Sequence, residues 1–160
     1  MNNTETFKVT TPSEREILLT RTFDAPRAAV FEAWTKAEHV KHWWDPTGVP
    51  LSVCEIDLRP NGAFRWVNSA HGGHVFAGTY REITAPERLV FTVKIFPSRP
   101  DPLTTILFSE EGSKTKLTMK IECASLEDRD MLLQMRIDVG TGRTLENLAG
   151  YLKRENLCKT

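Results

Sequence analysis

The sequence has 160 residues, and its 21 Lys and Arg are balanced by 21 Asp and Glu, so the formal net charge is zero. This balance argues against nucleic-acid binding, which needs surplus cations to displace phosphate counterions, and against a polybasic membrane-surface module. Hydrophobic residues make up 40%, and no stretch approaches the roughly 20 apolar residues that cross a bilayer. Together with an N-terminus that lacks a signal-peptide pattern, this predicts a globular, cytoplasmic protein with no membrane contact.

The first elements are a strand and two short helices. Residues 1–13 are mostly polar and predict a flexible tail, followed by a single domain over residues 14–160. β-branched and aromatic residues predict a strand over residues 17–23. Pro26 fits the first turn of a helix, and apolar residues then follow at helical spacing. A second short helix is predicted over residues 38–44.

From Leu51 the hydrophobic period changes to two. Apolar and polar residues alternate through several segments separated by turns that contain Gly, Asn or Pro, which is typical of strands joined by hairpins. The last hairpin pairs residues 103–108 with residues 116–121. After Ser125 the pattern becomes helical again, and one helix is predicted from Leu126 to about Leu152.

Two glycines, Gly140 and Gly142, lie inside this last helix. Glycine weakens an exposed helix by about 1 kcal/mol relative to alanine. Their presence indicates a close approach, a bend, or a helix held by tertiary contacts.

This order of elements predicts an α+β fold, in which a curved antiparallel sheet wraps around a long C-terminal helix. A meander of hairpins buries one face well only if the helix covers it. One helix cannot fill the space that a curved sheet encloses, so we expect an internal cavity between the sheet and the helix.

Several segments resemble the family of activator-of-heat-shock-protein-ATPase homologues, a branch of the START-like (SRPBCC) superfamily. They are Arg21-Thr-Phe-Asp-Ala-Pro26, Val30-Phe-Glu-Ala-Trp-Thr35, Trp43-Trp-Asp-Pro-Thr-Gly48 and Pro86-Glu-Arg-Leu-Val-Phe91. The similarity runs from about Arg15 to Leu152. It implies a helix-grip fold, in agreement with the order of elements.

The sequence departs from the family pattern at two places. Pro60-Asn61-Gly62 stands where relatives carry two glycines, and Asn is able to adopt the left-handed conformation of that turn. Gly140-Thr141 stands where relatives commonly carry Gly-Trp on the last helix. Loss of that indole is expected to enlarge or rehydrate the cavity.

Aromatic side chains are the best candidates for a functional site. We expect the cavity to be lined by Trp44, Phe64, Trp66, Phe76, Tyr80, Phe91, Met131, Met135, Thr141 and Leu145. An apolar pocket with a few polar groups is the usual form of a small-molecule site, and methionines give it an adaptable wall. The leading hypothesis is therefore binding of a small hydrophobic molecule, either aromatic or lipid-like.

Two alternatives come from other functional classes. The superfamily includes cyclases, so the resemblance permits a cyclase or dehydratase that uses the same cavity, with Asp138 as its one candidate acid or base. Buried beside apolar groups, this carboxyl would have a raised pKa. The family name suggests a chaperone-associated interaction domain, although the alternation places polar residues on the convex face. For a homodimer the only argument is the frequency of such dimers among small proteins.

No cofactor or metal is expected. His71 and His74 have no further ligand nearby and are interpreted as a hairpin tip, while His39 and His42 are expected on an exposed helix surface.

The remaining candidate groups also favour structural roles. Glu55 and Asp57 share the polar face of a strand, where pairing with Arg59 or Arg81 is favoured over catalysis. The three cysteines, Cys54, Cys123 and Cys158, form no close-spaced pair and predict neither a disulfide framework nor a zinc site.

Overall fold

Strands and helices occupy most of the chain in the computed structural model, which describes residues 7–69 and 74–155. Along these residues the elements are β1 (Lys8–Ser13), β2 (Glu16–Phe23), α1 (Arg27–Thr35), α2 (Ala37–Trp43), β3 (Val53–Ile56), β4 (Ala63–Asn68), β5 (His74–Thr84), β6 (Arg88–Val93), β7 (Leu103–Glu111), β8 (Lys114–Glu122), α3 (Leu126–Gln134) and α4 (Ile137–Arg154).

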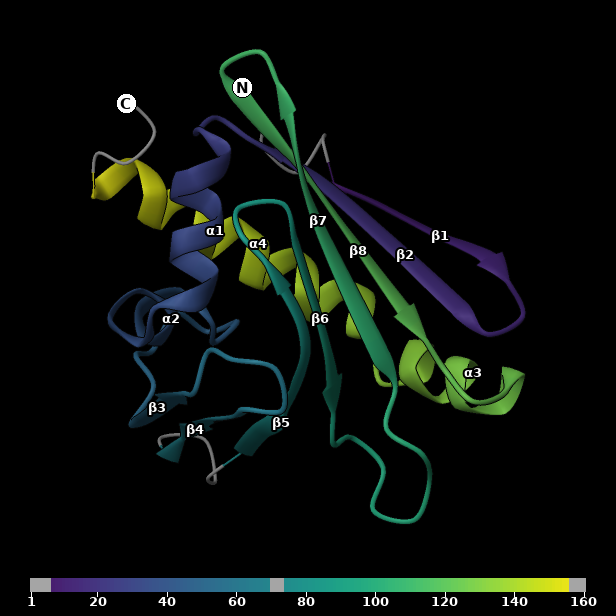
Figure 1. Cartoon of the computed structure of the whole chain (residues 1–160). Coiled ribbons are helices and arrows are strands. Elements are labelled where there is room, and N and C mark those ends of the chain that lie inside the picture. The colour runs from purple at the N-terminus through teal and green to yellow at the C-terminus, as the bar shows by residue number, and fades with distance from the viewer. Residues whose placement is uncertain (1–6, 70–73, 156–160) are drawn as a thin grey trace.

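The strands form one curved antiparallel sheet (Figure 1). In the described residues it has eight strands in the order β1-β2-β8-β7-β6-β5-β4-β3. Alternation sets which face is buried: along β2 every second residue from Ile17 to Phe23 is buried, Arg21 among them, while Leu18, Thr20 and Thr22 are partly exposed. The predicted α+β helix-grip fold is confirmed.

The helices cover the concave face of this sheet (Figure 1). α4 crosses the face, α1 and α2 pack near its C-terminal end, and α3 lies near its N-terminal end. The core between these layers is apolar and rich in aromatic residues. None of the helices in the described part of the chain is long and apolar enough to span a membrane.

The first strand of the sheet was not expected. The prediction of a flexible tail over residues 1–13 is wrong for residues 8–13, which form β1 and pair with β2 in the register Val9↔Leu19. Most of its side chains are exposed and it contains Pro12, as edge strands tolerate. Backbone pairing therefore holds most of this strand, since Val9 is its one partly buried residue. So few buried side chains leave no hydrophobic alternation in the sequence. The two short helices consequently follow the second strand of the chain, not the first.

The helix predicted from Leu126 to Leu152 is also wrong in one respect, because it is two helices. α3 ends at Gln134, and Arg136 adopts a left-handed conformation with φ of 60° before α4 begins. Neither glycine nor proline marks this break, so the sequence looks continuous across it. The chain changes direction at this break, and the residues of the break, Met135 and Arg136, line the cavity described below.

Two turn and helix predictions are confirmed at single residues. Asn61 has a φ of 69°, as the altered turn after Arg59 requires. At Gly142 an added Cβ would come within 3.1 Å of the Phe7 ring, so this glycine permits a close approach of the N-terminal segment to α4.

Candidate functional site

A cavity of about 490 Å³ lies between α4 and the concave face of the sheet. Its walls come from α1, α3 and α4, from the ends of β5 and β6, from β7 and β8, and from the segments that follow α2 and β6. The lining residues are Trp34, Trp44, Pro46, Val75, Phe76, Phe91, Val93, Lys94, Ile95, Thr104, Met119, Ile121, Leu132, Met135, Arg136, Ile137, Gly140, Thr141, Thr144 and Leu145.

One face of α4 forms a wall of the cavity. Ile137, Gly140, Thr141, Thr144 and Leu145 all line it, and their spacing of three and four residues places them on the same side of the helix. This face is mixed, with two hydroxyl groups beside aliphatic side chains. An apolar molecule in contact with α4 therefore has hydrogen-bonding groups within reach.

Aromatic rings form other parts of the wall. The ring centroids of Trp44 and Phe76 are 4.6 Å apart, and those of Trp34 and Trp44 are 6.0 Å apart. Phe91 joins them from β6. Such edge and tilted contacts are the preferred arrangement of aromatic side chains, so these rings form a well-packed surface.

Six of the ten residues predicted to line the cavity do so: Trp44, Phe76, Phe91, Met135, Thr141 and Leu145. The other four, Phe64, Trp66, Tyr80 and Met131, are not among its lining residues.

The three aromatic residues of this second group pack behind the wall instead. A Cβ built on Gly78 would lie 2.8 Å from the Phe64 ring, so that ring covers the bare backbone of β5. Trp66 and Tyr80 flank Phe64, with ring centroids 5.1 and 5.2 Å from it. Burial raises the pKa of the Tyr80 phenol, which stays neutral and belongs to the core.

Several lining residues are not among those predicted from the sequence. Trp34, Thr104, Met119 and Leu132 reach the cavity from α1, β7, β8 and α3 respectively. Their inward positions follow from helical or strand alternation, but alternation does not distinguish a side chain at a cavity from one in the packed core. That distinction depends on where α4 sits across the sheet.

Polar contacts hold the cavity segment after α2 against α4. The Thr144 hydroxyl donates a hydrogen bond of 3.0 Å to the carbonyl oxygen of Trp44. The Asn147 amide donates one of 2.8 Å to the carbonyl oxygen of Asp45. Two side chains of α4 thus satisfy the backbone of this segment and fix the position of Trp44.

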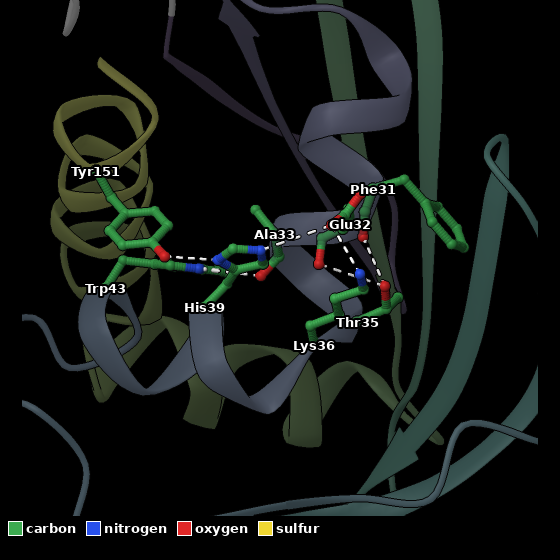
Figure 2. A network of polar contacts seen from close by, with 8 residues as sticks. All are labelled: Phe31, Glu32, Ala33, Thr35, Lys36, His39, Trp43 and Tyr151. Atoms are coloured by element: carbon green, nitrogen blue, oxygen red, sulfur yellow. Dashed lines mark hydrogen bonds and ion pairs between the residues drawn. The ribbon is translucent and has the colours of Figure 1, made fainter. Parts of the chain in front are cut away.

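A second set of contacts joins α1, α2 and α4 (Figure 2). Nδ1 of His39 lies 2.5 Å from the Tyr151 hydroxyl on α4, and the Trp43 indole donates a 3.1 Å hydrogen bond to the Ala33 carbonyl on α1. His39 is therefore half-buried and bonded, which corrects the expectation of an exposed surface position. His42 is exposed as predicted and stacks on the Tyr151 ring.

The prediction of a buried carboxyl with a raised pKa is wrong for Asp138. Its carboxylate pairs with the Arg136 guanidinium at 3.2 Å, and this contact holds the pKa of Asp138 below its ordinary value. It is not among the residues that line the cavity. Among the described lining residues the charged ones are Lys94 and Arg136, and none is acidic.

The other candidate groups have structural partners. Asp57 pairs with Arg59 at 2.9 Å, as predicted, and Glu55 is exposed. Cys54 and Cys123 are free thiols, and burial raises the pKa of each to about 11.

The structure describes only some of the histidine and cysteine residues considered as metal ligands. Residue His71 lies outside the described residues, as does Cys158, and His74 begins β5. Within the described ranges no group of three or more His, Cys, Asp or Glu side chains is arranged to hold a metal ion.

Solved structures from several organisms share this fold. A protein from Nitrosomonas europaea is 28% identical, with a TM-score of 0.80 over 90% of this chain and 97% of that chain. A protein from Rhodobacter sphaeroides is 19% identical, with a TM-score of 0.82 over 92% and 98% of the two chains. CalU16 from Micromonospora echinospora is 22% identical, with a TM-score of 0.66 over 96% and 88%. The last two show likeness of fold alone.

Comparison with curated proteins gives no match. The family model described as Activator of Hsp90 ATPase homolog 1-like protein matches residues 24–153. This range contains the segments after β2 on which the resemblance rested, together with most of the cavity wall. The chain belongs to the Activator of Hsp90 ATPase homolog 1-like family.

Proposed function

We propose that the protein binds a small hydrophobic molecule, aromatic or lipid-like, in the cavity between the sheet and α4. The cavity itself carries this proposal. Its volume of about 490 Å³ lies within the range of about 300–1,000 Å³ typical of small-molecule sites. Its walls are mostly apolar with a few polar groups, which is the usual form of a small-molecule site.

The walls suit an apolar ligand with few polar atoms. Removal of apolar surface from water contributes about 25 cal/mol per Å², so a ligand that buries about 200 Å² gains roughly 5 kcal/mol before the cost of association. The hydroxyls of Thr104 and Thr141 are the groups that would orient it. Thr144 already donates to the Trp44 carbonyl and is less available.

A reaction in the cavity has less support. The cyclase or dehydratase alternative depended on Asp138, whose carboxylate instead pairs with Arg136. A chaperone-associated role is the alternative from another class, named in the description of the family. It predicts that the purified protein changes ATP turnover by Hsp90 in a mixing assay.

Binding is tested with phenylnaphthylamine, an uncharged dye that fluoresces in apolar surroundings. We expect saturable enhancement with one site per chain, and competition by decanol. Thr141→Trp, which places an indole in the cavity, should abolish the signal. Thr118→Trp makes the same change on the outer face of β8 and should leave it intact. Absence of saturable enhancement with the unmodified protein would refute the proposal.

A further inference from the structure

Gly140 stands out among the residues of the cavity wall. It is half-buried in the first turns of α4 and lines the cavity between Ile137 and Thr144. Glycine in a helix interior lowers stability relative to alanine, because the unfolded chain loses more conformational freedom. A glycine at this position therefore calls for a reason.

Neither a strained backbone conformation nor tight packing explains why residue 140 is a glycine. Gly48 and Gly112 have positive φ, where side chains are strained. At Gly62, Gly78 and Gly142 an added Cβ would meet atoms at 3.1 Å or less. At Gly140 the φ is not positive, and apart from its chain neighbours and the backbone of its own helix an added Cβ would have no atom within 4 Å. A larger side chain would fit the fold at Gly140, and the space it would occupy adjoins the cavity.

We propose that Gly140 keeps this space open for the ligand, and that the ligand is a planar aromatic molecule lying against the bare backbone of α4. This inference rests on the proposed function and narrows it to one class of molecule. A helix without a side chain offers a flat surface, and absence of a Cβ lets a ligand approach the backbone closely. Gly140 is then the residue that determines which shapes the cavity accepts.

The other walls favour the same shape. Trp44, Phe76 and Phe91 line the cavity together with Gly140. A flat aromatic molecule stacks on such rings in offset or edge contacts, whereas a thicker saturated molecule cannot. Thr141 follows Gly140 on the same wall and places a hydroxyl beside the ligand.

The test compares three hydroxyl compounds with the same number of carbon atoms: naphthol, a phenol, and the two alcohols decahydronaphthol and decanol. The first is planar and aromatic, the second has the same ring skeleton but is thicker, and the third is a flexible chain. Isothermal titration calorimetry measures each against the unmodified protein. We expect naphthol to bind about tenfold more tightly than decahydronaphthol, a ratio of the size that shape complementarity in an apolar pocket gives.

Two glycine positions of α4 provide matched variants. Gly140→Leu should weaken naphthol binding by about tenfold or more, since its side chain enters the space the ligand needs. Gly150→Leu makes the same change outside the cavity, where the nearest atom to an added Cβ is the flexible end of Arg154 at 3.6 Å. It should bind naphthol like the unmodified protein. Gly140→Ala should raise Tm by about 2–4 °C and shows whether the helix tolerates a side chain there.

The binding and stability measurements test the role of Gly140, the planar shape of the ligand and the proposed function separately. Selective loss of naphthol binding in Gly140→Leu, with Gly150→Leu unchanged, supports the inference. Equal naphthol binding by both leucine variants overturns the role of Gly140, and a fall in Tm of Gly140→Ala overturns the claim that the space is open. Binding of decanol or decahydronaphthol as tightly as naphthol overturns planarity but leaves the proposed function intact. Binding of none of the three overturns the proposed function as well.

Discussion

Replacement of Thr141 by tryptophan should stabilise the protein, although it enlarges a half-buried side chain. The reason is that Thr141 faces a cavity of about 490 Å³. A tryptophan side chain buries about 150–250 Å² in a protein interior, so about 100 Å² of additional apolar surface leaves water here. At about 25 cal/mol per Å², less the entropy of fixing the side chain, the gain is about 1–2 kcal/mol.

Thermal unfolding followed by circular dichroism measures this gain. For a chain of this size 1 kcal/mol corresponds to about 2–4 °C, so we expect Tm to rise by about 3–6 °C. Thr118→Trp, on the outer face of the sheet, should change Tm little because its indole stays in contact with water. A fall in stability of about 1–3 kcal/mol in Thr141→Trp would be the signature of overpacking, and would refute the presence of free space beside α4.

Three further predictions concern polar groups around α4. Arg21 is buried and pairs with the half-exposed Glu146 at 3.1 Å. In urea unfolding, Arg21→Met should be neutral or stabilising by about 1 kcal/mol, whereas Glu146→Gln should destabilise by about 1–2 kcal/mol because it leaves a buried cation without its partner. A larger loss of stability in Arg21→Met than in Glu146→Gln would contradict this prediction. Asp138 has a lowered pKa in the folded state, so its contribution is present at neutral pH and lost as pH falls through that pKa. Asp138→Asn should therefore cost about 0.5 kcal/mol at pH 7, the cost should vanish once acid has protonated the carboxylate, and probe binding should not change. A cost that persisted in acid, or a loss of binding, would contradict this. Asn147→Ala should cost about 1 kcal/mol and speed amide hydrogen exchange in residues 44–50, since it removes the bond to the Asp45 carbonyl, whereas unchanged exchange would show that this bond does not hold the segment.

The overall fold was predictable because its strands are amphipathic. In β2 and β8 alternate residues are buried, which leaves a period of two in the sequence. β1 left no such signal, since it is an exposed edge strand joined to the sheet mainly by backbone hydrogen bonds. The break between α3 and α4 left no sequence signal either, because arginine is not a residue type that predicts the left-handed conformation adopted by Arg136.

The cavity was predictable in kind, whereas its lining was predictable only in part. A curved sheet around one helix encloses space, and Phe76 of β5 and Phe91 of β6 line that space. Which rings reach it depends on packing at single residues: Phe64 lies over Gly78 and is screened by its neighbours, whereas Phe76 on the adjacent strand reaches the opening. Asp138 shows the same limit, because the choice between the inner face and a partner such as Arg136 depends on where α4 begins.

Mass spectrometry of the freshly purified protein, under native and then denaturing conditions, tests ligand binding most directly. We expect a recurrent added mass that is present in the native spectrum, disappears on denaturation, and is missing from Thr141→Trp. An added mass carried equally by Thr141→Trp would place the bound molecule elsewhere. No added mass in either protein, even after incubation with naphthol and decanol, would contradict small-molecule binding in this cavity.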